Sequence, residues 1–200
     1  MRIGLTGGIG TGKSTVGRVL RDCGAVLIDA DLVGHRILER PDIRDRVAEV
    51  FGAGVLDERG AVDRGKLGPL VFADQTRRKA LEAIVHPPMI REIDDLARRA
   101  EPDGVVVIEA AILFEAGMAA LVDQVWVTHC SEKTQIERLS GRDGMSREEA
   151  LQRIRAQMPA ARRLALADEI IDTERPKDET KQDVVRRFRE IGDCRHDKED

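Results

Sequence analysis

Aromatic side chains are scarce in this sequence, whose 200 residues include no tyrosine, one tryptophan and four phenylalanines. Proteins that hold single-stranded nucleic acid stack its bases on such rings, and nucleic-acid binders usually carry a basic stripe. The formal net charge here is −4. We therefore expect no nucleic-acid partner, and we expect any nucleotide base to be held by backbone and aliphatic groups.

Cysteines and long apolar runs are also few. Cys23, Cys130 and Cys194 are odd in number and widely spaced, which matches neither a disulfide framework nor zinc-ligand spacing. The longest apolar run, residues 105–114, is interrupted by Glu109 and is too short to cross a bilayer. No secretory signal precedes the first expected strand. The sequence thus predicts a cytoplasmic protein with reduced thiols and no membrane partner.

What is present is a globular composition, with 42% hydrophobic and 35% charged residues. The length suits one domain with a sizeable core and inserted lobes. Short apolar segments alternate with segments of helical periodicity. Strands are expected at residues 2–6, 25–28, 105–108, 122–128 and 169–171. This alternation predicts an α/β fold with a five-stranded, mainly parallel sheet.

The stretch between the second and third expected strands is too long for a simple crossover. Residues 32–100 have helical periodicity, with breaks expected at Pro41, in the turn region 52–60 and at His86-Pro87-Pro88. We interpret this stretch as an inserted helical lobe.

Two later segments also read as helices. Ser146 and Glu149 form a capping-box pattern, which predicts a helix that continues to Met158. An amphipathic pattern that includes Val184 and Phe188 predicts a final helix before a polar tail.

A glycine-rich segment follows the first expected strand. Gly7-Gly8-Ile9-Gly10-Thr11-Gly12-Lys13-Ser14 fits the phosphate-binding pattern G-x-x-x-x-G-K-[ST], with the strand before it and the helix after it that the pattern requires. Glycines let the backbone turn its N–H groups toward a phosphate in conformations that a Cβ would obstruct. Lys13 would reach the β- and γ-phosphates of a nucleotide, and Ser14 would ligate Mg²⁺.

This loop serves GTPases, ATPases and kinases alike, so other features must decide between them. A guanine-reading N-K-x-D segment does not occur, and Asp57-Glu58-Arg59-Gly60 matches D-x-x-G only within a turn region. Oligomeric motor ATPases are normally longer. A small chain with a helical insert and several downstream arginines favours a small-molecule kinase.

Two acids follow the second expected strand. Asp29 and Asp31 would lie at the carboxyl end of the sheet, where ligands bind in open α/β folds. A carboxylate there can accept the proton of an acceptor hydroxyl. Either acid could instead cap the helix that begins near Leu32.

Other charged residues also have two interpretations. Arg138 and Arg142 lie four apart on a helix, a spacing that is also typical of a solvated face. Arg162 and Arg163 are interpreted as surface or lid residues. Glu109 ends an expected buried strand, where either contact with magnesium-bound water or a salt bridge to a buried cation would explain it. His86 before Pro87 can simply end a helix.

Together these residues resemble those of dephospho-coenzyme A kinase. The resemblance begins with residues 4–16 and 28–31 and continues in order over almost the whole chain. Further matching positions are Phe51-Gly52, Asp63-Arg64, Leu67, Val71-Phe72, Leu81-Glu82, His86-Pro87, Leu113-Phe114-Glu115, Arg138-Leu139, Arg142, Gln157-Met158, Ala167-Asp168 and Ile171. Three positions depart from the family pattern: Ala111 replaces a usual Pro, Glu109 a common Asp, and Asp172-Thr173 the usual Asn beside the adenine.

The resemblance implies transfer of the γ-phosphoryl group of ATP to the 3′-hydroxyl of the ribose of dephospho-coenzyme A, giving coenzyme A and ADP. It makes Asp31 the group that activates this hydroxyl, and Lys13 and Arg138 the charges on the transferring phosphoryl. Ser14 becomes the Mg²⁺ ligand. The ATP-binding positions are Gly8, Ile9, Gly10, Thr11, Gly12, Lys13, Ser14, Thr15 and Arg142. The acceptor-binding positions are Asp31, His86, Pro87 and Glu115.

The resemblance also implies a three-layer P-loop NTPase fold in a single domain over residues 1–195. Its core would comprise residues 1–31, 101–138 and 165–195, its acceptor-binding lobe residues 32–100, its lid residues 139–164 and its polar tail residues 196–200. We expect a monomer or weak homo-oligomer. The alternatives are another P-loop small-metabolite kinase, acting on nucleosides, nucleotides or shikimate, and a non-catalytic P-loop module.

Overall fold

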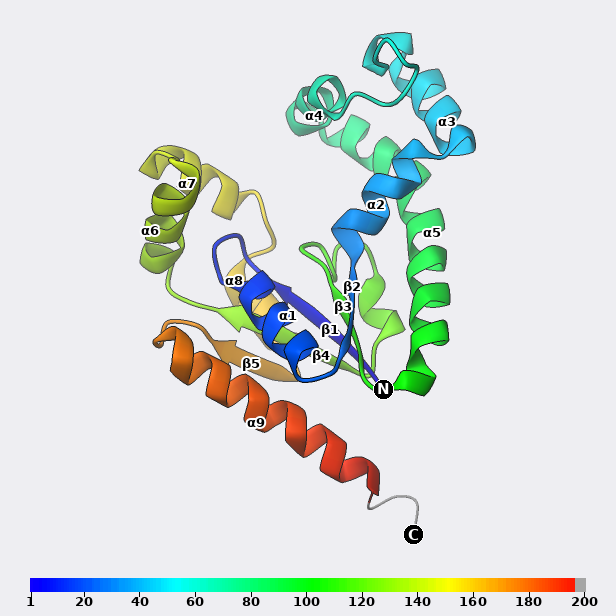
Figure 1. The fold of residues 1–200 in the computed structure, drawn as a ribbon. Coiled ribbons are helices and arrows are strands. Elements are labelled where there is room, and N and C mark those ends of the chain that lie inside the picture. The colour runs from blue at the N-terminus through cyan, green and yellow to red at the C-terminus, as the bar shows by residue number, and fades with distance from the viewer. Residues whose placement is uncertain (197–200) are drawn as a thin grey trace. The chain divides into compact units, whose positions relative to one another are not determined.

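The computed structural model describes residues 1–196 (Figure 1). Five strands form one sheet in the order β2-β3-β1-β4-β5. Strand β1 runs parallel to β3 and β4, and β4 runs parallel to β5. The strands are β1 (Arg2–Gly7), β2 (Val26–Asp29), β3 (Val106–Glu109), β4 (Gln124–His129) and β5 (Glu169–Asp172). Each expected strand is present within two residues of its predicted bounds, which confirms the α/β fold.

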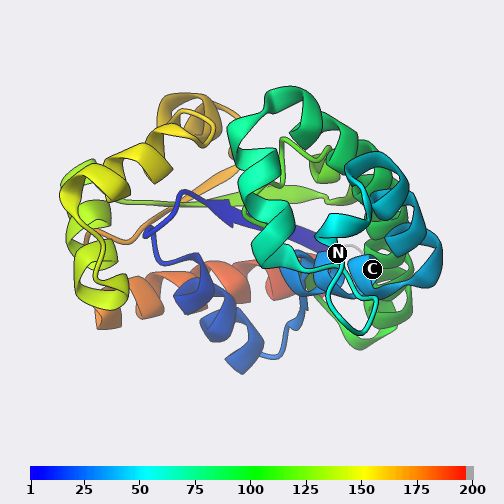
Figure 2. The same ribbon diagram turned by 90° about the horizontal axis from the view of Figure 1, so that it is seen from above.

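The described residues also form helices. They are α1 (Lys13–Asp22), α2 (Ala30–Glu39), α3 (Pro41–Phe51), α4 (Arg64–Ala73), α5 (Gln75–Ala100), α6 (Glu132–Asp143), α7 (Arg147–Arg155), α8 (Ala160–Ala165) and α9 (Lys177–His196), with short 3-10 turns η1 (Ala53–Val55), η2 (Glu101–Asp103) and η3 (Met118–Leu121). Figure 2 shows α1 and α9 along one face of the sheet and α8 on the other, which gives three layers. Of the helices within the described part, none combines the length and hydropathy that a bilayer crossing requires.

The chain divides into two compact units. The first contains residues 1–28 and 97–200, and the second contains residues 29–96. The expected lid, residues 139–164, falls within the first unit. The second unit contains α2, α3, α4 and most of α5, and covers nearly the same residues as the expected helical lobe.

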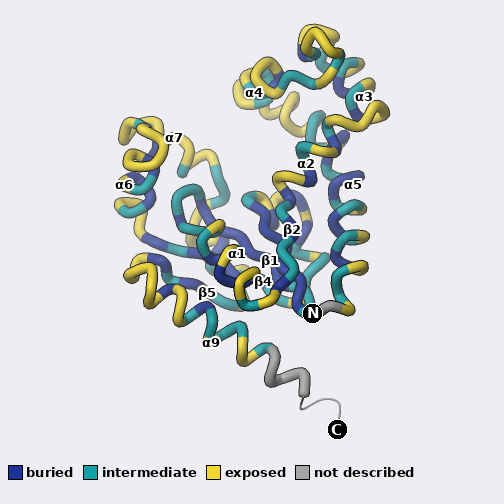
Figure 3. Tube along the Cα trace, in the orientation of Figure 1, coloured by how far each residue is buried: buried dark blue, intermediate teal, exposed yellow. Residues whose placement is uncertain are grey.

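The core of the first unit lies between the sheet and the helices α1 and α9. Apolar side chains at alternating positions of β1 face those at helical spacing on α1, because a strand repeats every two residues and a helix every 3.6. The buried cluster includes Ile3, Leu5, Val16, Leu20, Val107, Trp126, Ile171 and Val184. Figure 3 shows β1 and β4 buried along nearly their whole length, whereas α7 is mostly exposed.

Two predicted helix boundaries were wrong. Helix α5 continues through Pro87 and Pro88, where the sequence predicted a break. Each proline removes one backbone hydrogen bond, but Val85, Met89 and Ile93 on one face of α5 are buried, and burial of such a face supplies most of a helix's stability.

The second wrong boundary is the end of α7. The capping box of Ser146 and Glu149 is present, but the helix stops at Arg155 instead of reaching Met158. The residue before a proline avoids the helical region, and Pro159 follows Met158. At the C-terminus, α9 extends to His196, and the rest of the expected polar tail lies outside the described residues.

Candidate active site

The glycine-rich loop connects β1 to α1, as its sequence context predicted. Gly10 and Gly12 have φ angles of 77° and 84°, in the left-handed region that favours glycine. Helix α1 begins at Lys13 without a side-chain cap. The first-turn N–H groups of α1 therefore have no capping side chain, and such groups bind phosphate oxygens readily.

Lys13 and Ser14 meet a single buried carboxylate. Glu109, at the end of β3, is 5% exposed. Its Oε1 accepts hydrogen bonds from Lys13 Nζ at 2.9 Å and from Ser14 Oγ at 3.0 Å. Gly17 permits this approach, since a Cβ there would lie 2.4 Å from Glu109 Oε2. Of the two interpretations of Glu109, the salt bridge is present, although its cation, Lys13, is partly exposed.

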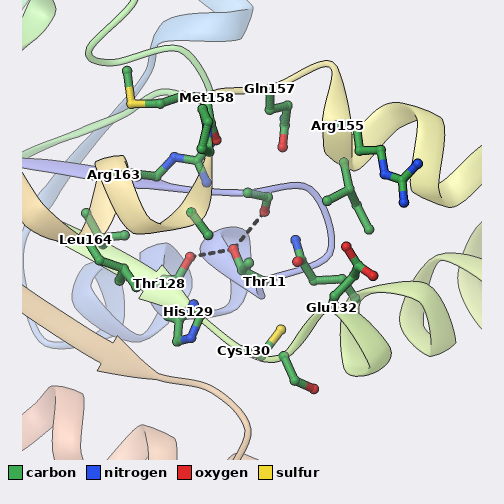
Figure 4. A pocket seen from close by; sticks show the side chains of 17 residues that line it. Thr11, Thr128, His129, Cys130, Glu132, Arg155, Gln157, Met158, Arg163 and Leu164 are labelled. Atoms are coloured by element: carbon green, nitrogen blue, oxygen red, sulfur yellow. Dashed lines mark hydrogen bonds between the residues drawn. The ribbon is translucent and has the colours of Figure 1, made fainter.

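The middle of the loop is fixed by threonine hydroxyls. Thr11 is buried, and its hydroxyl donates to the Gly8 carbonyl at 2.7 Å. The hydroxyls of Thr11 and Thr128 lie 2.7 Å apart, so the end of β4 holds the loop in place. Figure 4 shows these two hydroxyls facing one another.

Arg138 projects from α6 onto the same loop. Its Nη1 donates to the Gly10 carbonyl at 3.2 Å, and its Nη2 donates to the Thr173 carbonyl at 2.5 Å. The Thr173 hydroxyl lies 2.7 Å from the Thr11 carbonyl. Thr173 occupies the region where the sequence departs from the family pattern, and here it joins β5 to the phosphate-binding loop.

Two glutamine side chains bracket Ile9. The Ile9 N–H donates to Gln157 Oε1 at 2.8 Å, and the Ile9 carbonyl accepts from Gln135 Nε2 at 2.6 Å. Gln157 follows α7 and Gln135 lies on α6. The sequence analysis assigned no role to Gln135 and noted Gln157 only as a family match, because both contacts span more than a hundred residues of chain.

Arg163 had two interpretations, a surface residue or a lid residue. The surface interpretation was wrong, because Arg163 on α8 is only 4% exposed; the lid interpretation stays a prediction. Arg163 Nη2 donates to the Met158 carbonyl at 2.9 Å. Burial lowers the pKa of the guanidinium, and the charge of Glu115 opposes this shift.

Some of these groups line a pocket of about 350 Å³ in the first unit (Figure 4). Its walls come from the phosphate-binding loop, the end of β4 and the segment from α7 to α8. They include Gly8, Thr11, Thr128, Gln157, Met158 and Arg163. The pocket therefore opens beside the first half of the phosphate-binding loop.

The two acids after β2 have different positions. Asp29 caps α2, since its Oδ1 accepts from the Leu32 N–H at 3.0 Å. Asp31 lies exposed in the first turn of α2 and is not the capping residue. Both belong to the second unit. The capping alternative thus holds for Asp29, and the catalytic assignment of Asp31 stays a prediction.

The other predicted site residues are placed as follows. His86 lies half-buried within α5, and Pro87 follows it on an exposed position. Burial lowers the pKa of His86, opposed by the charge of Glu82. Arg142 is exposed near the end of α6 and forms an ion pair with Asp143 at 2.7 Å. The binding roles predicted for His86, Pro87, Glu115 and Arg142 stay predictions.

Comparison with known proteins identifies the family. A sequence model described as CoaE, dephospho-CoA kinase, matches residues 1–179. The chain belongs to the dephospho-CoA kinase family. This membership makes it an ATP-dependent phosphotransferase. The phosphate-binding loop agrees with this activity, because Lys13 and Ser14 are both present and both donate hydrogen bonds to Glu109.

Individual members of the dephospho-CoA kinase family are similar along most of their length. The dephospho-CoA kinase of Geobacter sulfurreducens is 44% identical over 193 residues, covering 94% of this chain and 95% of that protein. The dephospho-CoA kinase of Carboxydothermus hydrogenoformans is 41% identical over 187 residues, covering 92% and 90% of the two chains.

Solved structures agree. TT1252 from Thermus thermophilus superimposes with a TM-score of 0.80 at 34% identity, covering 91% of this chain and 92% of the other. Dephospho-CoA kinase from Campylobacter jejuni gives a TM-score of 0.74 at 25% identity, covering 97% and 98%. Shikimate kinase from Bacteroides thetaiotaomicron gives 0.53 at 16% identity, covering 96% and 98%, which shows a shared P-loop kinase fold alone.

Proposed function

We propose that this protein transfers the γ-phosphoryl group of ATP to the 3′-hydroxyl of the ribose of dephospho-coenzyme A, giving coenzyme A and ADP. The observation that carries this proposal is the match of residues 1–179 to the dephospho-CoA kinase family in a chain that retains Lys13 and Ser14 on an intact loop. A non-catalytic P-loop module would be expected to lose these groups.

Phosphoryl transfer depends mainly on positioning and on charge stabilisation, so the cations around the loop have the leading roles. The backbone of residues 8–15 cradles the β- and γ-phosphates. Lys13 exchanges its contact with Glu109 for one with phosphate oxygens. Arg138 contributes positive charge to the transferring phosphoryl from the α6 side, where it already touches Gly10.

A magnesium ion fits the oxygen ligands at the start of α1. Mg²⁺ prefers hard oxygen ligands, keeps several waters and is usually held by one or two protein groups together with substrate phosphates. The Ser14 hydroxyl and the Glu109 carboxylate, 3.0 Å apart, supply such groups. When bound, the ion would neutralise charge on the phosphates. Within the described residues, no three His, Cys, Asp or Glu side chains form a metal cluster.

The acceptor side of the proposal rests on the second unit. Asp31 accepts the proton of the acceptor hydroxyl or orients it for attack; its exposed position in the first turn of α2, directly after the end of β2, supports this role. His86 and Pro87 on α5, with Glu115 after β3, contribute to acceptor binding. Arg142 contributes to ATP binding by leaving Asp143 for a phosphate oxygen.

The cellular setting also belongs to the proposal. We place the enzyme in the cytoplasm, as a monomer or weak homo-oligomer, acting on a small molecule and not on nucleic acid. The low aromatic content and the net charge of −4 support the last point.

An ADP-release assay with a panel of acceptors tests the proposed substrate. We expect turnover with dephospho-coenzyme A to exceed that with nucleosides, nucleotides or shikimate by roughly 10³-fold or more, since a site built for one acceptor's polar groups rejects analogues that lack them. Mass spectrometry and phosphorus NMR would locate the new phosphate on the 3′-oxygen. Faster turnover of shikimate or a nucleoside would instead support the alternative kinases.

A further inference from the structure

Arg163 is a buried cation without a carboxylate partner. The residue is 4% exposed, and it forms no ion pair with any residue in the described part of the chain. Within the described residues, its buried Nε has no hydrogen-bond partner, and its one hydrogen bond joins Nη2 to the Met158 carbonyl. A guanidinium carries five N–H donors, so most of its bonding capacity is unused.

Such an arrangement costs stability unless something else compensates it. Buried charges are normally paired, and a lone buried charge is unfavourable because it has lost its hydration. Arginine nevertheless stays protonated in proteins. The negative charge of the exposed Glu115 favours the charged form of Arg163, but it acts only through space and without a hydrogen bond. An anion that enters the pocket would supply the missing partner.

The guanidinium faces the phosphate-binding loop. A Cβ built on Gly8 would lie 3.1 Å from Arg163 Nη1. Gly8 and Thr11 of the loop line the same pocket as Arg163. In Figure 4 the side chain extends from α8 below Met158 into the pocket. A positive charge is thus held next to the second residue of a loop whose backbone and lysine bind the β- and γ-phosphates of a nucleotide.

We propose that Arg163 is a further catalytic residue, whose guanidinium contacts the γ-phosphoryl group beside Gly8. This proposal rests on the proposed function for the identity of the acceptor, but the contact itself needs only ATP. Arg163 approaches Gly8 from α8, whereas Arg138 approaches Gly10 from α6. Two arginines from different elements would then surround the oxygens on which charge develops.

The competing explanation is structural: Arg163 could serve only to hold the Met158 carbonyl at the start of α8. The two explanations differ in what a neutral replacement does. Arg163→Gln keeps a side-chain amide donor for that carbonyl and removes the charge. Arg163→Met removes both but keeps an unbranched stem. Arg162→Met changes the neighbouring exposed arginine and is the matched control.

If Arg163 contacts the γ-phosphoryl, both Arg163→Met and Arg163→Gln should lower kcat roughly 10²- to 10³-fold, the usual loss for one preorganised donor to the transition state. Their melting temperatures should equal or exceed that of the wild type, because a lone buried charge has been removed. Arg162→Met should match the wild type in kcat and melting temperature. Affinity for ATP should fall more than affinity for ADP, which lacks the γ-phosphoryl group.

Three results would overturn the assignment. These are kcat within about threefold of the Arg162→Met control, recovery of wild-type kcat in Arg163→Gln, or melting of both variants well below the wild type. Calorimetric binding of ATP and ADP needs no acceptor. Loss of ATP-over-ADP preference in Arg163→Gln would therefore support the contact even if dephospho-coenzyme A were the wrong acceptor.

Discussion

At the scale of single residues, Lys13 has two roles that one substitution affects together. Its ammonium serves the phosphates, and it also neutralises the buried Glu109. Lys13→Met should therefore abolish nearly all turnover and also lower the free energy of unfolding by roughly 3 kcal/mol, since removing one member of a buried pair leaves a charge unpaired. Denaturant unfolding together with an ADP-release assay measures both effects.

The double variant Lys13→Met/Glu109→Gln is the control for that experiment. It removes the unpaired carboxylate and keeps an acceptor for the Ser14 hydroxyl, so stability should recover while activity stays absent. A single Lys13→Met variant as stable as the wild type would show that Glu109 does not need this partner.

Substitution of Asp31 should change catalysis with less effect on stability than substitution of Lys13. The cap of α2 is Asp29, so Asp31→Asn leaves that cap intact and keeps a side chain of the same size. If Asp31 activates the acceptor hydroxyl, kcat should fall by roughly 10²- to 10⁴-fold, with ATP affinity unchanged. Steady-state kinetics and ATP titration check this. Near-normal turnover would refute the catalytic assignment.

At the scale of elements, α6 and the segment after α7 both hold the phosphate-binding loop through Ile9. Gln157→Leu removes the acceptor of the Ile9 N–H, and an unsatisfied backbone donor costs about 1–3 kcal/mol. We expect KM for ATP to rise about tenfold or more, because the loop loses its fixed conformation. The exchange rate of the Ile9 amide should rise with it.

The matched control for this variant is Gln152→Leu, which changes an exposed glutamine on α7. It should leave KM for ATP and the Ile9 amide unchanged. If both substitutions had equal effects, the rise in KM for ATP would come from the lower polarity of the region around α7. It would not come from loss of the hydrogen bond between Gln157 and Ile9.

The elements also show what sequence patterns can and cannot predict. The strands were predictable because buried parallel strands read as short β-branched runs, and the loop was predictable because its glycines and lysine occur at fixed spacing. The continuity of α5 through Pro87 and Pro88 was not, since it depends on burial of Ile84 and Ile93. Burial depends on the tertiary fold, and local propensity is only a weak guide to it.

The candidate site likewise contains residues that the sequence identified and residues that became apparent only in the folded structure. Lys13 and Ser14 were identified from the loop motif and Arg138 from the family resemblance. The structure places Lys13 and Ser14 at the start of α1 and brings Arg138 from α6 into contact with the loop, whereas the roles of the three residues stay predictions. Gln135 was missed because its partner lies far away in sequence: the bond from Gln135 to Ile9 spans 126 residues. The burial of Arg163 was missed because it depends on the tertiary fold. From the sequence alone, an arginine that becomes buried in the fold cannot be distinguished from an arginine on the surface.

At the scale of the whole molecule, the half-buried His86 links stability to pH. Burial holds its pKa below the ordinary value of 6.5, with Glu82 opposing the shift. As pH falls below about 6.5, the unfolded chain takes up a proton that the folded chain resists. The free energy of unfolding should therefore decrease as the pH falls from about 6.5 toward the lower pKa that His86 has in the folded protein. His86→Gln cannot take up this proton, so between pH 8 and pH 5 its denaturation midpoint should fall less than that of the wild type. Identical falls in both proteins would mean that His86 titrates alike in the folded and unfolded states, and that its burial within α5 leaves its charged form fully hydrated.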